Sequence, residues 1–218
     1  LAVFGYAHVP SFKKHQQMID GAALPDGVAR AEQALAISEA LAAAGYRQIG
    51  LDHFALPGDD LATAQAAGRL RRNFQGYTTD ECETLIGFGA SAIGRTPAGY
   101  VQNAVHLGDY SARIAAGRLA AVKGYRLTAE DRLRADVIER LMCDFEADIA
   151  AICARHGFDA DSLLGGNERL ARLLDDGLAQ MSGGVVRVRG EHRFLVRAVA
   201  AAFDAYLDQS PRRHSKAA

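Results

Sequence analysis

Two histidines and an arginine-rich segment in the first third of the chain carry side chains that could do chemistry. His8 ends the first apolar run of the chain, and His53 ends the second. Imidazole can exchange protons near neutral pH, although each ring could equally bond a neighbouring loop. Arg72 lies in RRNFQ (residues 71–75), where guanidinium groups suit carboxylates and Phe74 offers an aromatic face. The same arginines could instead lie at a solvated helix end.

The elements that must position these side chains alternate in type. Residues 1–7, 46–51 and 85–93 are predicted strands, and residues 28–44 and 59–71 are predicted helices, from their apolar patterns and their Gly and Pro boundaries. This alternation is an α/β signature, in which ligand sites lie at the carboxyl ends of parallel strands. A complete eightfold barrel needs about 250 residues. The chain is therefore predicted to hold part of a barrel or of a doubly wound sheet.

From residue 124 onward the pattern becomes mostly helical. Thr128 is a predicted helix cap, with the acidic Asp131 at the third helical position. The predicted elements are helices at residues 128–143, 146–156, 167–176 and 191–207, and a hairpin that joins residues 178–181 to 185–189. This order is typical of a winged-helix-like module. The predicted domains are residues 1–123, residues 124–209 and a disordered tail at residues 210–218.

Composition and charge exclude several classes of protein. The 218 residues include 25 Lys and Arg against 26 Asp and Glu, which gives a net charge of −1. This balance argues against general binding to nucleic acid or to anionic membranes. No apolar run approaches the roughly 20 residues that a membrane span needs. The chain opens directly on Leu-Ala-Val-Phe without a Met, so we expect a fragment of a longer protein.

The sequence patterns of metal sites and of common nucleophiles are missing. There is no Cys-x-x-Cys, His-Glu-x-x-His, Gly-x-Ser-x-Gly or phosphate-binding Gly-x-x-x-x-Gly-Lys motif. Cys82, Cys143 and Cys153 are odd in number and widely spaced, which indicates reduced thiols and no disulfide framework. We therefore expect no metal site made by this chain alone.

Eight motifs, in one order along the chain, resemble the family of oxygen-independent coproporphyrinogen III oxidases. They are YAHVP (6–10), DHFA (52–55), RNFQGYTT (72–79), GFGASAI (87–93), YVQN (100–103), DRLR (131–134), LMCDF (141–145) and FDAYL (203–207). The pair DHFA and RNFQGYTT is the most specific. The resemblance covers essentially the whole chain before the tail.

The resemblance implies a fold and an activity. The fold class is α/β: the C-terminal part of a radical S-adenosylmethionine (radical-SAM) (β/α) partial barrel, followed by a mostly helical, winged-helix-like domain. Members of the family oxidatively decarboxylate two propionates of coproporphyrinogen III to vinyl groups in haem biosynthesis, forming protoporphyrinogen IX. They use a 5′-deoxyadenosyl radical made from S-adenosylmethionine by a [4Fe-4S] cluster. The family's Cys-x-x-x-Cys-x-x-Cys ligands are absent here, so we expect them upstream and expect this chain alone to be inactive.

The resemblance also implies site residues and partners. Ala7 matches a backbone contact to the cluster-bound S-adenosylmethionine. Phe74, Gln75 and Ile93 match contacts to a second S-adenosylmethionine molecule. Arg72, His8 and His53 are weaker candidates for substrate binding, from their side-chain chemistry and positions and not from the resemblance. The implied partners are coproporphyrinogen III and an external electron donor or acceptor, with no nucleic acid and no membrane, and the full-length protein is expected to be a cytoplasmic monomer.

Two alternative functions stay open at this point. A haem-chaperone relative shares the radical fold without the decarboxylation, although the DHFA and RNFQGYTT motifs argue against that branch. A nucleic-acid-binding winged helix is the other alternative, because four arginines (187, 189, 193 and 197) form a local basic cluster. Acidic residues outnumber basic ones from residue 128 onward, which disfavours binding to phosphates.

Overall fold

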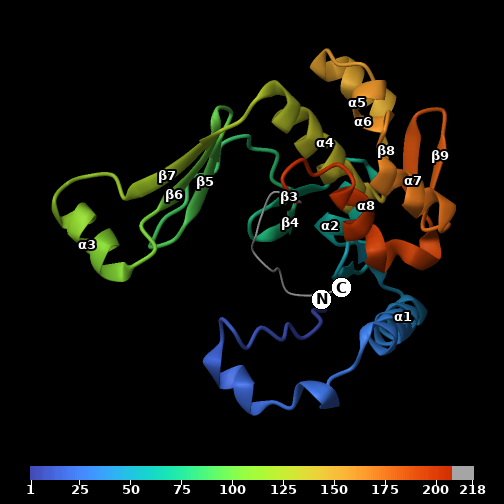
Figure 1. Ribbon diagram of the computed structural model, residues 1–218, viewed down its shortest axis with the longest axis horizontal. Helices are drawn as coiled ribbons and strands as arrows, with labels where there is room; N and C mark the ends of the chain where they lie inside the picture. Colours follow the sequence, from blue (N-terminus) through green and yellow to red (C-terminus); the bar gives the residue numbers. More distant parts are fainter. Residues whose placement is uncertain (208–218) are drawn as a thin grey trace.

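Helix α4 (Ala129–Asp144) lies at the centre of the molecule (Figure 1). The structure, a computed structural model, describes residues 1–207. The Thr128 hydroxyl accepts a hydrogen bond from the Asp131 N–H at 3.1 Å, and the Asp131 carboxylate accepts one from the Thr128 N–H at 2.8 Å. Phe145, in the left-handed region at φ 62°, ends the helix. The predicted cap and extent of this helix are therefore confirmed.

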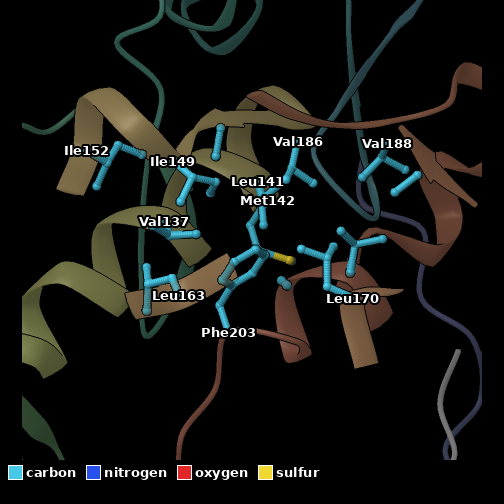
Figure 2. Close-up of a cluster of buried hydrophobic side chains, with 14 of the residues drawn as sticks. Val137, Leu141, Met142, Ile149, Ile152, Leu163, Leu170, Val186, Val188 and Phe203 are labelled. Atoms are coloured by element: carbon cyan, nitrogen blue, oxygen red, sulfur yellow. The ribbon is translucent and has the colours of Figure 1, made fainter. Parts of the chain in front are cut away.

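The C-terminal elements pack around α4 and form the larger of two cores (Figure 2). They are β8 (Glu146–Asp148), α5 (Ile149–His156), α6 (Asp161–Leu164), α7 (Glu168–Asp175), β9 (Ala179–Ser182), β10 (Val185–Val188), η3 (Gly190–Leu195) and α8 (Val196–Ala201). Val137, Leu141 and Phe203 have no exposed surface in this core. Strand β10 pairs antiparallel with both β8 and β9. Gly183 and Gly184, both with positive φ, make the tight turn of the predicted hairpin.

The elements before α4 are short. In chain order they are η1 (Lys14–Met18), η2 (Gly21–Ala23), α1 (Gly27–Ala43), β1 (Arg47–Ile49), β2 (His53–Ala55) and α2 (Asp60–Ala66). Strands β1 and β2 form an antiparallel hairpin in which Ile49 pairs with His53. Ile49, Ala62 and Leu70 build a second, smaller core that Cys143 of α4 joins. Helix α4 therefore belongs to both cores and ties the two parts of the chain together.

An arm extends away from these cores (Figure 1). At its base, β3 (Arg71–Asn73) and β4 (Gly76–Thr78) form a two-stranded hairpin. The arm itself is an antiparallel sheet of β5 (Ile93–Thr96), β6 (Gly99–Asn103) and β7 (Ala121–Arg126), with α3 (Leu107–Ala115) at its far end. All six residues of β7 are exposed, and α3 has no buried residue. The arm is thus held by its backbone ladder and contributes little to either core.

Two predicted strands are wrong. Residues 1–7 form only a bridge between Ala2 and His53, because β2 is three residues long and offers no further ladder. The segment is also largely exposed, with 69% of the Phe4 surface accessible. In residues 85–93 only Leu85 forms a bridge before β5 begins at Ile93. Positive φ values at Gly89 and Ser91 turn this segment out of the extended conformation.

Three predicted helices differ from the structure. The helix predicted at residues 59–71 stops at Ala66, because Gly68 adopts φ 65° and Arg71 begins β3. The helix predicted at residues 146–156 is β8 followed by α5. The helix predicted at residues 191–207 is η3 followed by α8, which ends at Ala201. Helices α1 and α7 match their predictions to within one or two residues.

The strand pairing also departs from the expectation of a parallel sheet. All named strand pairs in residues 1–207 are antiparallel. The predicted boundary between residues 123 and 124 falls inside β7, so the division into domains stays a prediction. None of the helices in residues 1–207 is long and apolar enough to cross a lipid bilayer. The predicted disordered tail, residues 210–218, lies outside the described residues.

Candidate functional site

His53 lies where β2 meets the hairpin of β3 and β4. Its Nδ1 atom is 2.7 Å from the Asp52 carboxylate, which sets the orientation of the ring. The rings of Phe4 and Tyr77 contact the imidazole edge-on, with centroid distances of 5.9 and 5.3 Å. A side chain added at Gly76 would lie about 4 Å from the imidazole. His53 is therefore a fixed, half-buried imidazole beside the RNFQGYTT hairpin.

Tyr77 connects this hairpin to both cores. Its hydroxyl accepts a hydrogen bond from the Leu51 N–H at 2.8 Å and donates one to the Met142 carbonyl at 3.0 Å. Burial raises the pKa of Tyr77 to about 12, so the hydroxyl keeps the proton that it donates. The ring fills the space above Gly50, where a Cβ atom would lie 2.0 Å from it. Tyr77 thus couples the turn between β1 and β2, the β3–β4 hairpin and helix α4.

The two arginines of the hairpin have different partners. Arg71 forms an ion pair with Glu139 of α4 at 3.2 Å, and the Arg72 backbone N–H donates to the same carboxylate at 3.0 Å. The Arg72 guanidinium lies over the Tyr77 ring, 5.6 Å from its centroid. Within residues 1–207 it makes no ion pair with a carboxylate. The structure thus overturns the helix-end interpretation and leaves the charge of Arg72 available to an anion.

The turn of the hairpin carries two of the predicted cofactor contacts, Phe74 and Gln75, and packs against the arm sheet that carries the third, Ile93. The Gln75 N–H donates to the Asn73 side chain at 2.8 Å, which shapes the turn and projects Phe74. Phe74 is 53% exposed and contacts the ring of Tyr100 in β6 edge-on, with 5.4 Å between centroids. Ile93 lies on the neighbouring strand, β5. An exposed aromatic face, a side-chain amide and an apolar side chain together fit a nucleoside-type ligand.

Ala7 and His8 lie in a separate loop at the start of the chain. Gln16 binds this loop at both ends: its amide donates to the Ala7 carbonyl at 3.0 Å and accepts from the Val9 N–H at 2.6 Å. His8 contacts the Tyr6 hydroxyl at 3.3 Å. No described contact joins Ala7 or His8 to the hairpin. The predicted roles of these two residues stay predictions.

The cysteines do not fit a [4Fe-4S] cluster. Cys82 is exposed in a loop, whereas Cys143 and Cys153 are buried on different helices. Burial raises the pKa of Cys143 to about 12, and burial also raises the pKa of Cys153, so both favour the neutral thiol. Within residues 1–207 no three His, Cys, Asp or Glu side chains gather as metal ligands would. The cluster ligands implied by the resemblance have no counterpart in these residues.

The chain is similar over nearly its whole length to curated proteins named oxygen-independent coproporphyrinogen III oxidase, although no model of a known protein family matches it. The relative from Bradyrhizobium diazoefficiens is 59% identical over 216 residues, which cover 99% of this chain and 48% of the relative. The relative from Thermostichus vulcanus is 42% identical over 220 residues, which cover 100% of this chain and 68% of the relative. The chain belongs to the oxygen-independent coproporphyrinogen III oxidase family.

A solved structure agrees with this family assignment. Coproporphyrinogen III oxidase from Escherichia coli, described as a radical SAM enzyme, matches 95% of this chain with a TM-score of 0.87 and 36% identity. The predicted fold class, part of a radical SAM fold with mixed helices and strands, is therefore confirmed, whereas its arrangement into domains stays a prediction. The match covers 48% of that structure, and the chain spans about half the length of the first curated relatives. The predicted family is likewise confirmed.

The sequence patterns did not predict the role of several residues that hold the β3–β4 hairpin in place. Tyr77 and Glu139 were not singled out, although they hold the hairpin on α4. Tyr100 lies within the motif YVQN, as Tyr77 lies within RNFQGYTT, and it supports Phe74. The alternating pattern of residues 71–78 could have indicated a hairpin, because Gly76 follows the turn residues directly.

Replacing Tyr77 with phenylalanine should lower the free energy of unfolding by about 1–3 kcal/mol. The ring would stay, but the Leu51 N–H and the Met142 carbonyl would lose their shared partner. Urea unfolding measures the change. Tyr46→Phe is the matched control, because no hydrogen bond of the Tyr46 hydroxyl is found in residues 1–207. Equal effects of the two substitutions would contradict the coupling role of Tyr77.

Proposed function

We propose that this chain is the C-terminal part of an oxygen-independent coproporphyrinogen III oxidase, which converts two propionates of coproporphyrinogen III to vinyl groups. The main observation in support of this proposal is the 59% identity to a curated oxidase over 99% of the chain. The Bradyrhizobium relative is about twice as long as the chain, so the activity is assigned to the longer protein. The chain alone is expected to be inactive, since its cysteines do not suit the cluster.

The surface made by Phe74, Gln75 and Ile93 is proposed to hold one molecule of S-adenosylmethionine. When bound, this group supplies the chemistry that removes a hydrogen atom from the substrate. Phe74 presents its exposed ring, and Gln75 presents a donor and an acceptor on a turn whose shape is fixed by Asn73. The Ala7 carbonyl already accepts a hydrogen bond from Gln16, so its N–H is the backbone group proposed to contact the cluster-bound S-adenosylmethionine.

Substrate binding is proposed to use the charge of Arg72. Coproporphyrinogen III carries propionate carboxylates, and a guanidinium is well suited to bind them. Arg72 is exposed and has no carboxylate partner within the described residues, whereas its neighbour Arg71 is paired with Glu139. His53 adds an imidazole that is oriented by Asp52 and contacts the edge of the same Tyr77 ring. His8 is the weaker candidate, because it lies in the N-terminal loop.

The C-terminal helices are proposed to cover the reaction site and help exclude water. The basic cluster of the winged-helix-like part is largely occupied: Arg187 pairs with Glu146 at 2.6 Å, Arg189 pairs with Glu191 at 2.7 Å, and Arg193 stacks on Phe145. This occupancy disfavours binding to nucleic acid. The proposed setting is a cytoplasmic, monomeric enzyme that exchanges electrons with an external partner.

A hybrid enzyme tests the proposed function. Joining this chain to the N-terminal half of the Bradyrhizobium relative should restore a protein that consumes coproporphyrinogen III and releases protoporphyrinogen IX under anaerobic, reducing conditions with S-adenosylmethionine. Chromatography of the products measures the conversion, and the isolated chain serves as the inactive control. A hybrid that binds haem but forms no protoporphyrinogen IX would favour the haem-chaperone branch. Product formation by the isolated chain would contradict the requirement for the other half.

A further inference from the structure

One face of the arm sheet gathers polar and cationic side chains beside the proposed cofactor surface. In antiparallel pairs, directly opposed residues point to the same face. Ile93 is opposed to Gln102, and Gln102 is opposed to Lys123. These three side chains therefore form one row across β5, β6 and β7, with about 5 Å between neighbouring strands. We call this set the Lys123 row.

A second row on the same face carries the aromatic contacts of the site. Arg95, Tyr100 and Tyr125 are opposed to one another in the register of the sheet. Phe74 packs on Tyr100, and the Tyr206 hydroxyl bonds both Tyr125 and Asp131. Phe74 thus packs on the middle of this row, and Tyr206 binds the row at its β7 edge. The Lys123 row lies directly beside it.

The Lys123 row carries an unpaired positive charge. Lys123 is exposed, and within residues 1–207 it makes no ion pair with a carboxylate. The Gln102 amide nitrogen donates to the Ser91 carbonyl at 3.3 Å, which restrains the orientation of the amide. Residues 93–127 contain five Lys and Arg residues against one Asp, so the neighbourhood is electropositive.

We propose that Lys123 and Gln102 form a carboxylate-binding subsite next to Ile93. This inference rests on the proposed function, which supplies two ligands with carboxylates: the propionates of coproporphyrinogen III and the methionine part of S-adenosylmethionine. An ammonium group beside a side-chain amide offers several donors to one carboxylate. Lys123 is a substrate- or cofactor-binding residue in this proposal and takes no part in proton transfer.

Kinetics of the hybrid enzyme test the subsite. Lys123→Gln should raise the KM for one ligand about tenfold or more, with kcat changed less than twofold, because a charge-assisted hydrogen bond is lost from binding. A rise in the KM for coproporphyrinogen III assigns a propionate, and a rise in the KM for S-adenosylmethionine assigns its carboxylate. Lys123→Arg should keep both values within about threefold of the parent, because the positive charge stays.

Arg126→Gln is the matched control, because Arg126 is exposed on the same strand and its side chain points to the opposite face. It should leave both KM values unchanged. Gln102→Leu provides a second variant with the same expected direction as Lys123→Gln. Unchanged KM values in the Lys123 and Gln102 variants would overturn the subsite, and so would an equal effect of Arg126→Gln.

Equilibrium binding separates this inference from the proposed function. Titration of the hybrid enzyme with coproporphyrin III, followed by porphyrin fluorescence, needs no turnover. If the parent hybrid neither binds this porphyrin nor forms product, the proposed function fails. If the parent hybrid binds or turns over the substrate and Lys123→Gln behaves identically for both ligands, the function stands and the subsite fails.

Discussion

Replacing Gly50 with alanine is expected to lower the free energy of unfolding by more than about 3 kcal/mol. Gly50 adopts φ 57°, which a residue with a Cβ atom tolerates poorly. The added Cβ would lie 2.0 Å from the Tyr77 ring, which cannot move without breaking its hydrogen bonds to Leu51 and Met142. Both effects act on the link between the β1–β2 turn, the RNFQGYTT hairpin and α4.

A matched control separates backbone strain from the steric clash. Gly45 also has a positive φ, 86°, but a Cβ there would meet nothing within 4 Å. Gly45→Ala should therefore cost only about 1 kcal/mol, the penalty of the left-handed conformation itself. Denaturant unfolding of both variants measures the difference. Equal losses at the two positions would contradict a clash with Tyr77.

A double-mutant cycle sharpens this test. In a Tyr77→Ala background the ring is absent, so the further cost of Gly50→Ala should fall to about that of Gly45→Ala. The same pair bears on function, because Tyr77 contacts His53 and lies under the Arg72 guanidinium. Gly50→Ala in the hybrid enzyme should therefore also reduce turnover. If the Gly50→Ala hybrid folds and keeps full activity, the packing of Tyr77 on Gly50 does not contribute to the function of the site.

Replacing Phe203 with alanine is expected to cost about 3–5 kcal/mol of unfolding free energy. The Phe203 side chain has no exposed surface and lies in the middle of the larger core, among side chains of α4, α6 and β10 (Figure 2). Its removal would leave a cavity that these elements cannot fill without moving. Thermal or urea unfolding of the chain measures the loss.

Phe88 supplies the control for this prediction. It is 89% exposed, so Phe88→Ala should change the unfolding free energy by less than about 0.5 kcal/mol. A second variant, Phe203→Leu, keeps most of the apolar volume and should cost clearly less than Phe203→Ala. A loss below 1 kcal/mol for Phe203→Ala would show that the site is not a packed core position.

Local signals in the sequence predicted the elements that depend on neighbouring residues in the chain. The capping box of Thr128 and Asp131 begins α4 because both hydrogen bonds span only three residues. The Gly183-Gly184 turn joins β9 and β10 because the two glycines accept positive φ. The ordered motifs likewise predicted the family, because their residues and their order along the chain are given by the sequence alone.

Predictions failed where distant partners decide the conformation. No strand was predicted in RNFQGYTT, but the segment forms a hairpin held by Glu139 and by the Met142 carbonyl, which lie more than 60 residues away. The first apolar run was expected to be a buried strand, yet Phe4 is exposed beside His53. Strand preference depends on cross-strand and packing neighbours, which a single segment does not reveal.

The sequence by itself determined the family, the central capped helix, the β9–β10 hairpin and the residue types of the site. Only the tertiary structure decided which of those residues meet. The register of β5, β6 and β7 puts Ile93, Gln102 and Lys123 on one face, and the packing of the β3–β4 turn brings Phe74 onto Tyr100. Register is set by pairing between strands that are far apart in sequence, so it follows from the folded sheet and not from local pattern.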